Sequence, residues 1–210
     1  DLAKQYLQQL IDAGFHDSQA HYYLGRIQQS DKEIMAAIAN YSRVQAGEFL
    51  LDARIREAAL LAQTGKIDEA LSKLQQLSEI SQDNNSQVKV YLAQAEVLRA
   101  AHREQEAMTI YNNALKDSPE NVDLLYARAL TAEKLNMLDV TESDLRMVLV
   151  HEPDNANALN ALGYTLADRT ERLQEAREYI LRAAALLPDD PAVLDSLGWV
   201  YYRLGEMEKA

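Results

Sequence analysis

The sequence is poor in the residues that build cross-linked or irregular proteins. Its 210 residues include no cysteine, 7 glycines and 4 prolines. The lack of cysteine excludes a disulfide scaffold, a zinc ribbon and a thiol nucleophile. Glycine and proline are the strongest breakers of regular structure, so their scarcity predicts few turns and favours a helical protein.

Positive charge and long apolar runs are scarce as well. The chain has 21 Lys and Arg against 33 Asp and Glu, which is a formal net charge of −12. This excess of acid argues against nucleic acid as a partner, because sequence-independent binding depends on Lys and Arg neutralising phosphates, and against adsorption to an anionic membrane surface. No stretch approaches the roughly 18 consecutive apolar residues that span a bilayer, so we expect no direct membrane insertion by this chain.

The motifs of known catalytic and metal sites are also missing. The four histidines do not form an i, i+4 pair of the kind that binds zinc on one helix face. There is neither a Gly-rich phosphate loop nor a Gly-x-Ser-x-Gly elbow, and we interpret the many carboxylates as solvation of helix surfaces. We therefore expect a protein that is not an enzyme, with no metal and no cofactor. The histidines are His16, His21, His102 and His151.

The few breakers recur at a nearly constant interval. Pro119 and Pro153 lie 34 residues apart, and Pro188 follows after 35; Gly163 and Gly198 are also 35 apart. A fixed period in this range is typical of stacked repeats. Each of the three prolines ends a helix, since the residue before proline avoids the α region, and the Asp or Asn that follows can cap the next helix.

The chain divides into a single array of segments, each with two apolar-periodic stretches of about a dozen residues that predict paired amphipathic helices. In one segment we expect helices over 122–135 and 139–150. We expect a fragment of a longer protein, with an incomplete repeat at each end. The predicted repeats are 18–50, 51–87, 88–121, 122–155 and 156–190, preceded by the second helix of a truncated repeat in 1–17 and followed by a truncated repeat in 191–210.

Small residues recur where the two helices of each pair would cross. A side chain no larger than a methyl group lets two helices approach closely, so these positions predict tight packing within each pair. They are Gly25, Ala58, Ala95, Ala129, Gly163 and Gly198 in the first helices and Ala37, Ala70, Ala107 and Ala176 in the second helices.

The pattern Leu159-x-x-Leu162-Gly163-x-x-Leu166, followed by Ala176, Ile180, Ala183 and Pro188, resembles the tetratricopeptide repeat, or TPR. The resemblance implies an all-α superhelical solenoid of antiparallel helix pairs. It also implies a non-enzymatic scaffold or adaptor that binds a protein or peptide in the concave groove lined by the first helices.

The groove positions of the TPR family give the candidate site residues. Aromatic side chains with a polar tip bury a large area at little cost in rotamer entropy, and Asn157 and Asn160 each offer a donor and an acceptor. The alternative for the aromatics is packing between adjacent repeats. Charges of both signs occupy the groove, unlike the Lys, Asn and Arg pattern of TPR co-chaperones that clamp a carboxylate. The candidates are Tyr22, Arg26, Tyr126, Asn157, Asn160, Tyr164, Asp168, Asp195, Trp199, Tyr202 and Arg203.

Residues 156–204 further resemble proteobacterial TPR outer-membrane lipoproteins that act as adaptors of a periplasmic carboxyl-terminal processing protease. This resemblance implies that the partner is such a protease or its substrates, and that the full-length protein is periplasmic and associated with the outer membrane. Two alternatives stay open: a cytoplasmic, chaperone-like peptide-binding module, and a TPR arm of a larger enzyme. Self-association through truncated ends is a further expectation, because a solenoid that lacks its capping repeats exposes apolar surface.

Overall fold

The computed structural model describes residues 2–15, 17–81, 83–208 and 210. Over these residues the regular structure consists of twelve α-helices, with no strand, as the sequence predicted. His16 lies outside the described residues. The helices are α1 (Leu2–Asp12), α2 (Asp17–Ser30), α3 (Ile34–Tyr41), α4 (Leu50–Gln63), α5 (Ile67–Ile80), α6 (Asn84–Ala100), α7 (Glu104–Asp117), α8 (Val122–Lys134), α9 (Leu138–His151), α10 (Ala156–Arg169), α11 (Leu173–Leu186) and α12 (Pro191–Arg203).

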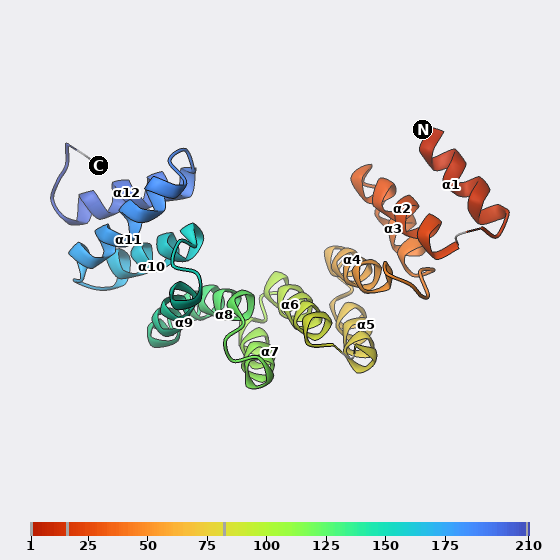
Figure 1. Cartoon of the computed structure of the whole chain (residues 1–210), viewed down its shortest axis with the longest axis horizontal. Helices are drawn as coiled ribbons and strands as arrows, with labels where there is room; N and C mark the ends of the chain where they lie inside the picture. The colour runs from red at the N-terminus through yellow and green to blue at the C-terminus, as the bar shows by residue number, and fades with distance from the viewer. Residues whose placement is uncertain (1, 16, 82, 209) are drawn as a thin grey trace. The chain divides into compact units, whose positions relative to one another are not determined.

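The chain forms two compact units, residues 1–107 and 108–210. Within the first unit α2 pairs with α3 and α4 with α5, and within the second α8 pairs with α9 and α10 with α11 (Figure 1). First helices of successive pairs also touch, as α10 and α12 do. The helices predicted over 122–135 and 139–150 are confirmed as α8 and α9. The boundaries of the repeats stay a prediction.

The residues after the prolines cap the next helices as predicted. Asn121 accepts a hydrogen bond from the backbone N–H of Leu124 at 3.0 Å, and Asn155 accepts one from that of Ala158 at 2.9 Å. Asp190 likewise accepts from the second and third residues of α12. Each cap pairs backbone donors that a helix N-terminus leaves without partners, and so fixes where α8, α10 and α12 begin.

The small residues mark close helix crossings in both units. A β-carbon on Gly25 would lie 2.9 Å from the Tyr41 ring, and one on Gly163 would lie 2.5 Å from Cγ1 of Ile180. Gly198 differs, since the nearest atom to a β-carbon there would be the carbonyl oxygen of Ala210, at the ordinary contact distance of 3.5 Å. The predicted tight packing is therefore present at Gly25 and Gly163 and absent at Gly198.

A small core cluster fixes α12 against the α10–α11 pair. Leu159, Ala183 and Val193 come from the three helices and are almost completely buried. Burial of three such side chains stabilises the junction by several kcal/mol at about 25 cal/mol per Å² of apolar area. This junction positions the face on which the candidate site lies. Within the described part of the chain, none of the helices has the length and apolarity needed to cross a membrane.

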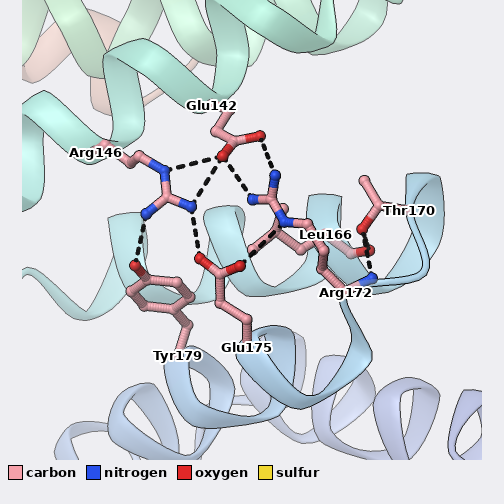
Figure 2. Close-up of polar contacts among 7 residues, drawn as sticks. All are labelled: Glu142, Arg146, Leu166, Thr170, Arg172, Glu175 and Tyr179. Carbon is pink, nitrogen blue, oxygen red and sulfur yellow. Dashed lines mark hydrogen bonds and ion pairs between the residues drawn. The ribbon is translucent and has the colours of Figure 1, made fainter.

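Four charged side chains join α9 to α11 and to the turn before it (Figure 2). Arg146 of α9 pairs with Glu142 at 2.9 Å and with Glu175 of α11 at 2.5 Å, and its guanidinium also donates to the Tyr179 hydroxyl at 3.1 Å. Arg172 bonds both oxygens of Glu142, at 2.6 and 3.1 Å, and pairs with Glu175 at 3.0 Å. Each carboxylate thus faces two guanidinium groups, an arrangement that links neighbouring helix pairs more effectively than isolated surface ion pairs do.

Candidate peptide-binding groove

A cavity of about 560 Å³ lies between α10 and α12 in the second unit. Five of the predicted site residues line it. Spacings of four and three residues put Tyr164 and Asp168 on one face of α10, and Asp195, Trp199 and Tyr202 on one face of α12. The lining residues are Tyr164, Asp168, Leu194, Asp195, Gly198, Trp199, Tyr202 and Ala210.

Aromatic rings form the apolar wall of this cavity. Trp199 and Tyr202 stack with their ring centroids 5.5 Å apart and their planes 19° from parallel. Tyr164 is 37% exposed, Leu194 is 49% exposed and Tyr202 is 52% exposed. These apolar surfaces are open to solvent at one concave place, as is typical of a binding surface.

The polar side of the cavity is acidic. Asp168 and Asp195 both line it, and Arg169 pairs with Asp168 at 2.8 Å and approaches Glu133 at 3.7 Å. The pKa of Tyr164 is raised, first by burial and then by the negative charges of Asp168, Asp195 and Glu133, against the opposing charge of Arg169. The carboxylates therefore outweigh the guanidinium in the field at this ring.

Arg203 was predicted to line the groove, but it is not among the described residues that line the cavity. Its guanidinium donates to the backbone carbonyls of Ala167, Asp168 and Thr170 at the C-terminal end of α10. Carbonyls at a helix C-terminus lack intrahelical partners and carry partial negative charge, so a cation there is stabilising. Arg203 thus ties α12 to α10 and helps to hold the two walls of the cavity at their spacing.

Three other predicted residues lie on first helices without being among the described residues that line this cavity. Tyr126 of α8 is half-buried, and burial raises its pKa. Asn157 is exposed near the start of α10. Asn160 is half-buried, and its Oδ1 is a buried acceptor without a hydrogen-bond partner among the described residues.

Tyr22 and Arg26 belong to the first unit. Tyr22 is only 6% exposed, and its ring stacks on Phe49 with the centroids 4.5 Å apart. Its hydroxyl donates to Asp52 at 2.6 Å, and the Arg26 guanidinium lies 6.0 Å from its ring centroid. Tyr22 is thus mainly a core residue, whereas Arg26 is exposed.

A second cavity, of about 340 Å³, lies between α4 and α6 in the first unit, and none of the candidate site residues lines it. Its walls are mostly small and apolar. The sequence signal that could have found it is the run of small residues on the groove faces of two successive first helices. The lining residues are Ile55, Ala59, Ala62, Gln63, Ala93, Glu96, Val97 and Ala100.

The family model for the tetratricopeptide repeat matches residues 142–191, which contain α10 and α11. The fold agrees with solved TPR structures. YrrB, a TPR protein with an unusual peptide-binding site, matches with a TM-score of 0.58 and 17% identity over 90% of this chain and 96% of that one. The chain has the fold of a tetratricopeptide repeat solenoid. A TPR protein from Parabacteroides merdae also matches this TPR array, with a TM-score of 0.67 and 16% identity over 96% of this chain and 75% of that one.

Two sequence relatives are much longer than this TPR array. The TPR repeat-containing protein PA4667 of Pseudomonas aeruginosa is 44% identical over 191 residues, which cover 91% of this chain and 32% of that protein. Bacteriophage adsorption protein A of Escherichia coli is 40% identical over 81 residues, which cover 39% of this chain and 8% of that protein. The array thus spans about a third of the Pseudomonas protein and a smaller part of the other.

Proposed function

We propose that this TPR array is a non-catalytic scaffold that binds a segment of another protein in the cavity between α10 and α12. The observation that carries the proposal is the convergence of Tyr164, Trp199 and Tyr202 on one open cavity together with Asp168 and Asp195. Aromatic anchors in a concave site, flanked by a few polar groups, are the usual composition of an energetically important contact region.

The size of the cavity supports a segment of chain as the ligand. At about 560 Å³ it lies within the range of sites that enclose a small ligand or a few side chains, and it is open on one side. TPR grooves in general hold extended or helical peptides. Peptide binding is also stated for the structurally similar YrrB.

We further propose that the partner is a periplasmic carboxyl-terminal processing protease or one of its substrates, and that the full-length protein is an adaptor associated with the outer membrane. The likeness of residues 156–204 to adaptor lipoproteins supports this assignment. The 44% identity to a TPR protein of Pseudomonas aeruginosa supports a proteobacterial setting.

Titration against two kinds of probe tests the proposal. One probe is the purified carboxyl-terminal processing protease of Pseudomonas aeruginosa, and the other is an array of acetylated, amidated 15-residue peptides tiled along that protease and along casein. Saturable binding of the protease to the TPR array supports the adaptor, provided that the protease also degrades casein faster when the TPR array is present. If peptides bind but the protease neither binds nor degrades casein faster, the result supports a free-standing peptide-binding module and contradicts the adaptor. If neither probe binds, the scaffold function is contradicted.

A further inference from the structure

We infer that the cavity between α10 and α12 selects a Lys or Arg side chain of the bound segment. This inference rests on the proposed function and specifies which residue the same site recognises. It follows from how aromatic faces and carboxylates are combined in one cavity, and from where the nearby positive charges lie.

The aromatic wall suits a cation. The face of an aromatic ring carries negative electrostatic potential, and a Lys or Arg head group within about 6 Å of the ring centroid is attracted to it. The stacked pair Trp199 and Tyr202, facing the same cavity as Tyr164, offers such surfaces. The apolar stem of a Lys or Arg side chain would pack along Leu194 in the same cavity, because these long side chains bury their methylene groups and leave the charge at the tip.

The carboxylates of the cavity lack enough positive charge nearby to neutralise them. Asp195 is exposed and forms no ion pair with any described residue. Asp168 and Glu133 share a single guanidinium, that of Arg169, which also donates to Asn136. Arg203, the other cation of these helices close to the cavity, points at the backbone carbonyls that end α10. A ligand with a positive side chain supplies the missing charge.

The polarity is the reverse of a carboxylate clamp. A ligand carboxylate would lie beside Asp168 and Asp195 and would be repelled by both of these like charges. A neutral side chain would leave Asp195 unpaired. Of the three ligand types, the cationic one is favoured by both the rings and the carboxylates.

The test uses the tightest peptide from the tiled array and its Lys/Arg→Gln and Lys/Arg→Glu versions, measured by fluorescence polarisation at about 0.15 M salt. We expect the Gln version to bind about 3- to 5-fold more weakly, the size typical of a partly exposed charge pair, and the Glu version more weakly still. Asp195→Asn should lower affinity for the original peptide by a similar factor and leave affinity for the Gln version unchanged.

Charge reversal gives the sharper result. Asp195→Lys should weaken the original peptide on the order of 10-fold and restore binding of the Glu version, a coupling that damage to the fold would not produce. Asp189→Lys is the matched control, because Asp189 is an exposed carboxylate of the same unit that does not line the cavity. Equal effects of the two substitutions, or selected peptides without Lys or Arg, would overturn the inference and leave the scaffold function standing. If no peptide of the tiled set binds, the inference is overturned; if the protease does not bind either, the scaffold function is overturned as well.

Discussion

Gly163 and Ile180 pack so closely that a β-carbon on Gly163 would lie 2.5 Å from Cγ1 of Ile180. The carbonyl oxygen of Ala176 would lie 3.0 Å from the same β-carbon. Rotation of Ile180 relieves only the first of these contacts, because the second is to backbone. The α10–α11 pair, which carries one wall of the cavity, therefore depends on the absence of a side chain at this position.

Gly163→Ala should destabilise the second unit by about 1–3 kcal/mol, the usual cost of overpacking a tight contact. Gly198→Ala is the matched control, since it adds the same methyl group at the equivalent place in α12 with only an ordinary contact to Ala210. Alanine is the better helix former, so the control should be neutral or more stable by up to about 1 kcal/mol. Urea unfolding followed by circular dichroism measures both, and equal effects of the two changes would refute the close-packing account.

Glu57 should be the most sensitive carboxylate of the first unit. Its side chain is 1% exposed, and it pairs with Arg54 and with Lys73, each at 2.8 Å. Glu57→Ala leaves Arg54 and Lys73 without their carboxylate, but both are partly exposed and regain some water, so we expect a loss of about 2–4 kcal/mol. Glu106→Ala, which breaks the exposed pair with Arg103, should cost much less stability than Glu57→Ala does. Chemical denaturation measures the loss of unfolding free energy in each variant, and a comparable loss in both would contradict the prediction.

The charged network of α9 and α11 makes stability depend on pH. Arg172 lowers the pKa of Glu142, and Arg146 lowers the pKa of Glu175, so both carboxylates bind protons more weakly in the folded protein. Their contribution is therefore complete above their ordinary pKa, near 4.5, and is lost as the pH falls through the lower folded values.

The variant Glu142→Gln/Glu175→Gln should be less stable than the wild type by about 1 kcal/mol at neutral pH, and this gap should close as the pH falls below the ordinary pKa of 4.5. Added salt should narrow it as well. Glu178→Gln, a change of an exposed carboxylate on α11 outside the network, serves as control and should show no such trend. Denaturant midpoints at a series of pH values give the result; a gap that widens in acid would rule out the ion-pair explanation.

The fold was predictable because each repeat carries its own signals for helix ends, caps and amphipathic faces. Spacing of Pro119, Pro153 and Pro188 located the helix ends, and the caps at Asn121 and Asn155 formed where the sequence predicted them. Apolar periodicity placed α8 and α9 to within one residue at each end. Local signals were sufficient here, since turns, caps and amphipathic faces depend on neighbours in the sequence.

The site was less predictable, because groove residues depend on contacts between helices. Tyr164, Asp195 and Trp199 meet at one cavity, as their positions in the repeat suggested. Arg203 occupies a groove position too, but the free carbonyls at the end of α10 hold its guanidinium. The burial of Glu57 was not predictable from the sequence either. We interpreted the carboxylates as solvated, whereas the packed structure buries this one.

The central claim is that the cavity between α10 and α12 binds the partner. The affinity of Tyr164→Ala/Trp199→Ala for the tightest probe, protease or peptide, tests it most directly, with helical content checked by circular dichroism. Removing two aromatic anchors should weaken binding at least 10-fold while the helices persist. Tyr6→Ala/Phe15→Ala, which removes two exposed aromatics from the first unit, should bind like the wild type. A folded Tyr164→Ala/Trp199→Ala variant that also binds with wild-type affinity would show that the partner binds elsewhere.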